Sequence, residues 1–329
     1  MKKTLCTLLA ILMATSMISC GKQTTPETPV TQEKPTESKT ESENNIPKEP
    51  KNYTLMCIPS TFMDDEVQDS TEFPKSLIDN VTIQYQEEAD VVTSFSNYGT
   101  TLENSKAEST KTLTIDGETY KYTFESSVAN EWAQSQVPSV LEYAYFDNYT
   151  CNDPKSTVSF NSKSGKLTSF VRYDVNCESE GDIGEKAISQ KADELLLELY
   201  GNEYLNRYTK TVEYVKYSIN TYEYIVLYRR NYGKYLGDDW VRFHFSPKGE
   251  LKGINARYLN LLADFDFTEE DLDDAKEAMF SAIYSDPNEW HGGDILLTID
   301  GLTGTCYMET YVFSYNGKEV EWRFLLALN

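Results

Sequence analysis

The stretch WVRFHFSPKGELKGINARYL, residues 240–259, decides the fold. Its apolar residues Val241, Phe243 and Phe245 alternate with charged or polar ones, which is the pattern of a strand with one buried face. Gly249 follows at a position suited to a turn, and a second strand-like run comes after it. The stretch therefore predicts an antiparallel hairpin with one apolar face that another element must cover.

The segments in front of this hairpin predict two more strands and a helix. TVEYVKYSI (211–219) and YEYIVLYRR (222–230) are rich in β-branched and aromatic residues, as strands are. GEKAISQKADELLLELYG (184–201) has apolar residues three and four positions apart, which predicts an amphipathic helix that ends at Gly201. We expect this helix to cover one face of the strands.

The same order of elements returns further along the chain. TEEDLDDAKEAMFSAIYSDP (268–287) predicts a second amphipathic helix, with Thr268 as its N-cap and Asp286-Pro287 beyond its end. Three strand-like segments follow, and Asn316-Gly317 is typical of a two-residue hairpin turn between the last two. These segments are DILLTID (294–300), CYMETYVFSY (306–315) and VEWRFLLAL (320–328). The chain therefore predicts a β-dominated α+β fold in which one helix-plus-antiparallel-sheet unit is used twice.

Residues 53–180 are predicted to form a separate β-rich domain that ends near the ESEGDIG cluster. TLTIDGETYKYTF (112–124) predicts a hairpin with Asp116-Gly117 at its turn. SSVANEWAQSQVPSVLEYAYF (126–146) predicts a helix that is interrupted at Pro138. The C-terminal domain would then span residues 181–329.

Two short hairpins repeat within the chain. FNSKSGKLTSF and FSPKGELKGI superpose on their turn glycines, Gly165 and Gly249, which are expected to have a positive φ. Together with the helix that precedes each set of strands, this pattern resembles the PepSY domain of exported bacterial proteins, over residues 184–260, 268–329 and the hairpin at 157–173.

The PepSY resemblance implies two or three PepSY/cystatin-like units in tandem. It also implies a modulatory role, because such domains accompany secreted peptidases as propeptides. The family's Asp-x-x-Thr-Gly-like turn is NSKSG and SPKG here, so no functional residue is carried over.

Residues 1–19 have the layout of a bacterial export signal. Two lysines precede an apolar run that is too short to span a bilayer at helical rise, and Ser19 follows it. The motif Met17-Ile18-Ser19-Cys20 resembles the lipobox of bacterial lipoproteins, with Met17 where leucine is usual. The resemblance implies a lipid (palmitate-type acyl chain) on Cys20, and buried acyl methylenes would anchor the chain to a membrane. The alternative is an ordinary signal peptide with a coincidental cysteine.

Residues 20–52 are predicted to be a disordered spacer. They consist almost entirely of Thr, Pro, Glu, Lys, Ser and Asn, and such a composition cannot bury enough apolar surface to fold. The whole chain carries a formal net charge of −23, which argues against nucleic acid as a partner. We therefore expect a lipid-anchored protein on the extracytoplasmic face of the cell membrane.

Four cysteines remain when Cys6 and Cys20 are set aside. Residues 151 and 177 are symmetric about residue 164, which lies in the turn of the hairpin predicted between them, so Cys151 and Cys177 are a candidate disulfide. The alternative is two free buried thiols, and the sequence does not decide between them. Cys57 and Cys306 follow no pattern that predicts a partner.

The sequence contains no recognisable catalytic or metal-binding motif. It lacks the Walker, H-E-x-x-H and G-x-S-x-G patterns, and it has only two histidines. We therefore predict no enzyme activity, no cofactor and no metal site. Trp290 and His291, in a predicted loop, are the candidate binding surface.

The most favoured function is thus a non-enzymatic binding or modulatory module whose partner is a cell-surface protein or a peptidase. Two alternatives stay open. The first is a cell-envelope carbohydrate-active hydrolase, which needs two converging carboxylates. The second is the solute-binding lipoprotein of a transporter.

The lipid anchor leads to a test by substitution. Cys20→Ala should move the protein from the membrane fraction to the soluble fraction, because the acyl chains would be lost. Fractionation followed by immunodetection measures the distribution, with Cys57→Ala as the control that leaves the anchor in place. Membrane retention of the Cys20→Ala chain would show that the motif has been misread.

Overall fold

The computed structural model describes residues 51–59, 80–85, 99–103, 106–257, 265–283, 294–315 and 318–328. Their strands form one mixed sheet, so the predicted β-dominated α+β class is confirmed. The strands are β1 (Tyr53–Pro59), β2 (Val81–Tyr85), β3 (Thr100–Thr101), β4 (Thr110–Ile115), β5 (Glu118–Ala129), β6 (Tyr145–Asn152), β7 (Lys155–Asn161), β8 (Leu167–Arg172), β9 (Tyr208–Lys216), β10 (Tyr222–Tyr232), β11 (Tyr235–Phe245), β12 (Leu251–Arg257), β13 (Leu296–Ile299), β14 (Cys306–Tyr315) and β15 (Lys318–Ala327). The helices are the 3₁₀ turn η2 (Glu131–Gln134), α3 (Pro138–Leu141), α4 (Glu185–Tyr200), α5 (Asn202–Leu205) and α6 (Glu269–Ile283).

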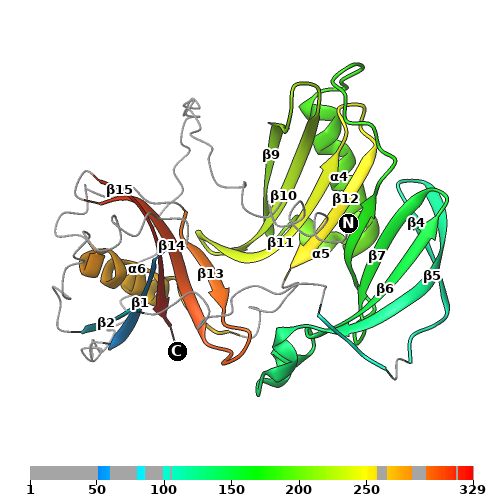
Figure 1. Cartoon of the computed structure of the whole chain (residues 1–329). Coiled ribbons are helices and arrows are strands. Elements are labelled where there is room, and N and C mark those ends of the chain that lie inside the picture. Colours follow the sequence, from blue (N-terminus) through cyan, green and yellow to red (C-terminus); the bar gives the residue numbers. More distant parts are fainter. Residues whose placement is uncertain are drawn as a thin grey trace, which may run out of the picture. The chain divides into compact units, whose positions relative to one another are not determined.

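Strand β11 is the junction of the sheet (Figure 1). Along one edge it pairs with β10 through Tyr235–Leu236 and again through Trp240–Phe245, with a shift of register between these two stretches. Along the other edge its first half pairs in parallel with β13, and its second half pairs antiparallel with β12. The sheet continues from β12 through β8, β7, β6 and β5, and from β13 through β14, β15, β1 and β2. The two predicted helix-plus-sheet blocks therefore share one sheet through β11, and the β8–β12 pairing joins the strands on either side of residue 180.

Both long helices form where the sequence predicts them. The buried side of α4 consists of Ile188, Ala192, Leu195 and Leu196, which pack with the apolar residues of β9 to β12. Its last residue is followed by Gly201, whose φ of 89° is the positive value that ends a helix.

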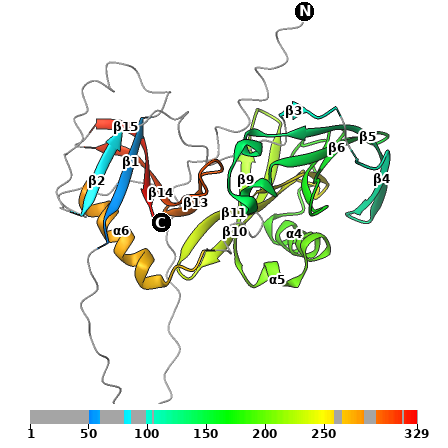
Figure 2. The ribbon, with the colours of Figure 1, turned by 90° about the horizontal axis from the view of Figure 1, so that it is seen from below.

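Helix α6 has the predicted N-cap. The Thr268 hydroxyl accepts a hydrogen bond from the Asp271 amide at 3.1 Å, and the Asp271 carboxylate accepts one from the Thr268 amide at 3.2 Å. This reciprocal pair satisfies two backbone donors at the helix start. Leu272, Ala275 and Met279 then face a core made with β1 and β13 to β15. Figure 2 shows α4 beside β9 and β10, and α6 beside β1 and β2.

Both helices pack on the same side of the sheet, as the alternation along β11 shows. Tyr235 donates a hydrogen bond to Asp273 of α6 at 2.5 Å, and Phe243 is buried in the cluster formed with α4. Odd-numbered residues of β11 therefore point to the helices, because successive side chains of a strand alternate between faces. The even-numbered residues, from Leu236 to His244, lie on the other side, on which neither α4 nor α6 packs; we call it the helix-free face.

The turns agree with the sequence in three places. Asp116 and Gly117 both have a positive φ, as a type I′ hairpin turn requires, and they join β4 to β5. Gly165 and Gly249, the turn glycines of the two similar hairpins, also have positive φ values of 68° and 81°. Residues 286–287 and 316–317 lie outside the described residues, but β14 and β15 pair as the predicted hairpin requires.

The predicted interrupted helix over residues 126–146 is wrong. The first part of this segment belongs to β5, and only η2 and α3 are helical, each four residues long. Asn130 ends the strand and caps η2 by accepting a hydrogen bond from the Trp132 amide at 3.0 Å. Trp132 is fully buried, so tertiary packing rather than helix propensity fixes this segment.

Cys151 and Cys177 are free thiols in the structure, which is the alternative to the candidate disulfide that the sequence leaves open. The symmetry about residue 164 is correct, because β7 and β8 pair with that register. The hairpin, however, ends at Lys155, where the chain turns back into β6. Cys151 therefore lies on β6 opposite Ser156, while the backbone oxygen of Cys177 accepts a hydrogen bond from Tyr222 of β10. Strand β7 separates β6, which holds Cys151, from β8, which precedes Cys177.

Candidate functional site

The helix-free face carries a row of three large side chains at the centre of the sheet. Trp240 of β11 stands directly opposite Arg229 of β10 on one side and Arg257 of β12 on the other. Arg242 follows two positions along β11, so it points to the same face. Its guanidinium lies 4.8 Å from the centroid of the Trp240 ring, within the range of a cation–π contact. We call Arg229, Trp240, Arg242 and Arg257 the Arg–Trp patch.

One carboxylate serves two of these arginines. Asp238 lies 3.0 Å from Arg257 and 3.6 Å from Arg229, and it accepts a hydrogen bond from Thr298 of β13 at 3.4 Å. Burial raises the pKa of Asp238, and Arg257 opposes that effect. The side chain is only 10% exposed, so the ion pairs hold it in a place where a lone carboxylate would be costly.

Arg242 has no such partner. Its Nε is buried without a hydrogen-bond acceptor, and the described residues place no carboxylate at ion-pair distance from it. Burial lowers the pKa of the Arg242 guanidinium, and the neighbouring charge of Arg229 lowers it further. One terminal nitrogen of Arg229 is likewise buried without a hydrogen bond, because its distance of 3.6 Å to Asp238 is too long for one.

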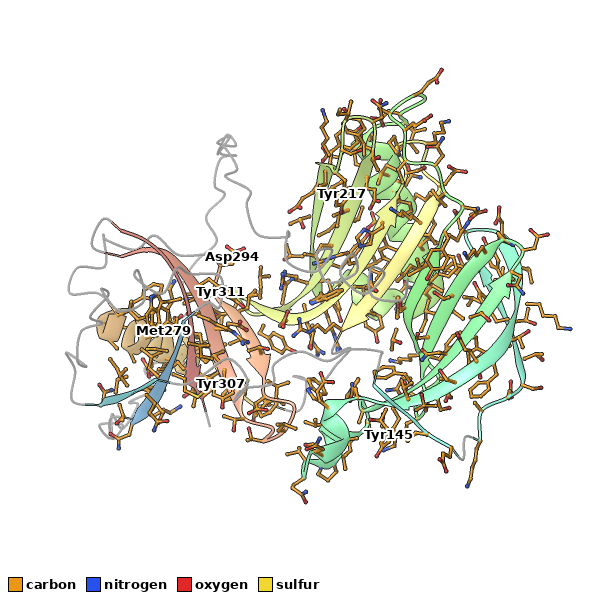
Figure 3. All side chains as sticks on the ribbon, viewed as in Figure 1. Tyr145, Tyr217, Met279, Asp294, Tyr307 and Tyr311 are labelled. Carbon is orange, nitrogen blue, oxygen red and sulfur yellow. The ribbon has the colours of Figure 1, made fainter. Side chains whose placement is uncertain are left out.

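Beyond β13, polar side chains recur on this face of the last two strands, next to a small apolar cluster that includes Tyr307 and Leu325. Arg323 of β15 donates to Glu309 of β14 at 2.6 Å, with both side chains nearly buried. Tyr311 stands directly opposite Arg323 on β14, and Figure 3 labels it there. Burial alone would lower the pKa of Arg323, but Glu309 and Tyr311 outweigh it and raise that pKa.

A second cluster lies near the β9–β10 hairpin, where Figure 3 labels Tyr217. Glu223 is 4% exposed and accepts hydrogen bonds from Lys252 and, at 3.3 Å, from His244 Nδ1. The Cys177 thiol lies 3.9 Å from the same carboxylate. Burial raises the pKa of this thiol, and the charge of Lys252 opposes that effect without outweighing it, so the geometry does not activate the thiol as a nucleophile.

Small polar residues extend the helix-free face toward β6. The Ser159 hydroxyl donates to Asn148 at 2.6 Å, and the Ser169 hydroxyl donates to Asn255 at 3.4 Å. Asn255 stands opposite Arg242. The face is therefore a continuous polar surface that runs from the Arg–Trp patch across five strands.

An apolar cavity of about 250 Å³ lies near the start of α6. Phe265, Phe267, Leu272 and Cys306 are among its lining residues, and the two phenylalanine rings stack at 5.7 Å. This volume is below the roughly 300–1,000 Å³ of ordinary small-molecule pockets. We therefore take the helix-free face, and not this cavity, as the candidate site.

The structure does not describe the sequence-predicted binding residues, since Cys20, Trp290 and His291 lie outside the described residues. The sequence does not predict the Arg–Trp patch as a whole, because Arg229 and Arg257 come to Trp240 only through the pairing of β10 and β12 with β11. The signal was present in WVRFHF: the alternation that buries Val241 also turns Trp240 and Arg242 to the opposite face.

Comparison with known proteins found no matching family model, no matching curated protein and no matching solved structure. Among the described residues, no helix is long and apolar enough to cross a membrane. The same residues include no group of three or more His, Cys, Asp or Glu side chains placed to hold a metal ion.

The Glu223 cluster predicts a pH dependence of stability. Burial raises the pKa of Glu223, but the hydrogen bonds from His244 and Lys252 outweigh it, and the pKa is lowered overall. A lowered folded-state pKa gives stability that is present above the unfolded value of about 4.3 and is lost as the pH falls through the folded value. Glu223→Gln should therefore cost about 1–3 kcal/mol at pH 7, and this cost should shrink below pH 4.

Urea unfolding of both chains between pH 3 and pH 7 measures this difference. Glu213→Gln is the matched control, because Glu213 is an exposed carboxylate on β9 with no hydrogen bond within the described residues. A Glu223→Gln cost that stays constant down to pH 3 would contradict the assigned cluster.

Proposed function

We propose that this protein is a lipid-anchored extracytoplasmic binding module. It is held at the membrane through Cys20 and binds a cell-surface protein or a peptidase with its helix-free face. The spacer over residues 20–52 sets the folded part away from the lipid, so that this face can reach a partner.

The observation that carries this proposal is the composition of the Arg–Trp patch. Trp and Arg, together with Tyr, are the residues that most often dominate the binding energy of protein interfaces. Here one tryptophan stands between two arginines in a cross-strand row, and its ring contacts a third arginine. The described helices α4 and α6 pack on the opposite side, so neither of them covers the row.

The PepSY resemblance supports a peptidase as the partner. Each block has the order helix, then antiparallel strands, and the turn glycines of the two similar hairpins both have a positive φ. We propose that the two blocks are tandem PepSY-like units. Their strands pair through β11 and β13 into one sheet.

Substitution of the patch tests the proposal. Trp240→Ala should weaken binding to the partner at least tenfold, because a central interface tryptophan is a typical hot spot. Leu197→Ala is the control, since Leu197 is a large apolar residue that is 42% exposed on α4, away from the helix-free face.

The measurement uses secreted peptidases from the same cells, tested singly against the purified protein by surface plasmon resonance and by inhibition of peptide hydrolysis. The proposal would be overturned if Trp240→Ala and Leu197→Ala lost the same amount of binding affinity. It would also be overturned if the wild-type protein bound no peptidase and no surface protein.

A carbohydrate-active hydrolase is the second candidate. The helix-free face holds two carboxylates, Asp238 and Glu309, that interact electrostatically, and burial raises the pKa of Asp238 as a general acid requires. Each carboxylate is, however, engaged by arginine, and structural ion pairs also shift pKa values. Release of reducing ends from cell-wall glycan by the purified protein would favour this candidate over the binding module.

A further inference from the structure

The helix-free face contains guanidinium donors that lack an acceptor. Arg242 Nε and a terminal nitrogen of Arg229 are buried without a hydrogen bond. A buried charged donor without a partner costs free energy, so a native protein that keeps two of them in one place needs a reason.

The acids around these donors do not supply the missing acceptors. Asp238 is shared between Arg257 and Arg229, and its hydrogen-bond distance of 3.0 Å is to Arg257. Glu309 is engaged by Arg323 at 2.6 Å. Glu213 of β9 is exposed and forms no described ion pair with Arg242. These side chains leave a surplus of positive charge on this face, although the whole chain has a net charge of −23.

The register brings the two donors together. Arg229 is opposite Trp240, and Arg242 is two residues further along the same strand and opposite Leu227. Arg229 and Arg242 are thus diagonal cross-strand neighbours, which are about 7–8 Å apart at the backbone and within reach of each other through long side chains. Trp240 forms an aromatic wall beside both.

We propose that Arg229 and Arg242 bind an oxyanion, a carboxylate or a phosphate group, on the helix-free face beside Trp240. The guanidinium fork matches the two oxygens of either group, and charge-assisted hydrogen bonds would satisfy the orphaned nitrogens. Half-buried Ile225 and Leu227 on β10 add apolar surface next to the anion. The site therefore suits an anionic group attached to a body that can rest on the indole ring and these aliphatic side chains.

This inference deepens the proposed function, because the oxyanion would be the acidic group that the partner presents to the patch. It does not depend on which partner that is. Small anions test it directly, so its failure and the failure of the proposed function are distinguishable.

The test is thermal unfolding of the purified full chain in inorganic phosphate, in glutarate and in sodium chloride, all at equal ionic strength. Binding to the native state raises the melting temperature by mass action. Phosphate, glutarate or both should raise it by about 2–4 °C over chloride, and the anion with the larger effect identifies the group that the site prefers.

Tryptophan fluorescence provides a second measurement. The emission should change and saturate over the same anion concentrations. Trp240→Phe should remove most of this fluorescence change while keeping the rise in melting temperature.

Arg242→Gln should weaken the affinity for the anion at least tenfold, as measured from the dependence of the melting temperature on anion concentration. Without anion, this variant should be as stable as the wild type or more stable, because a buried charge without a partner is removed. Arg229→Gln provides a second variant with the same expected loss of the anion effect if the first does not fold. Arg172→Gln is the control: Arg172 is a partly buried arginine whose Nε lies 3.1 Å from Asp174, so it has the acceptor that Arg242 lacks, and its loss should leave the anion effect unchanged.

Two results would overturn the proposal. One is a wild-type protein that shows the same melting temperature in all three salts. The other is an anion effect that survives both Arg242→Gln and Arg229→Gln.

Discussion

Two adjacent ion pairs, one on each face of the sheet, fix the junction on which the rest of the structure depends. Arg229 of β10 pairs with Asp238 of β11 on the helix-free face. The next residues, Arg230 and Asp239, pair on the helix side at 3.8 Å, where Tyr232 donates a further hydrogen bond to Asp239 at 2.7 Å. A slip of one residue would turn every side chain of β11 to the wrong face. It would also turn Asp238 and Arg242 toward the apolar clusters beneath α6 and α4, where unpaired charges are costly, so this register is strongly favoured.

The register of β11 has consequences in two directions. It sends Val241, Phe243 and Phe245 to α4, and it lets the first half of the strand pair with β13, which brings the second block and α6 to the same side. It also sends Trp240 and Arg242 away from the helices. One constraint therefore produces both the packed side of the sheet and the charged face that we propose as the binding surface. The unpaired guanidinium nitrogens on this face are expected to reduce stability, as residues kept for binding commonly do, and this agrees with the binding role that we propose.

The sequence predicts the repeating elements well, because they follow from local periodicity and turn chemistry. Both long helices, the positive φ of Gly165 and Gly249, and the Asp116-Gly117 hairpin are all found where the pattern places them. Contacts between residues far apart in the sequence are harder to predict. The Cys151–Cys177 prediction used the right register but overestimated the length of the hairpin, and no local pattern shows that β11 pairs with β13. The matching Arg229-Arg230 and Asp238-Asp239 pairs were a usable signal for the site, since they flank the turn at Gly233 within one hairpin.

A crystal structure of the protein grown in phosphate tests the central claim most directly. We expect Trp240 and Arg242 to lie on the side of β11 opposite α4, and Arg229 and Arg230 to pair with Asp238 and Asp239 on opposite faces. We also expect an oxyanion bound to Arg229 and Arg242. A structure with Trp240 packed beneath α4, or with β11 shifted by one residue against β10, would contradict it.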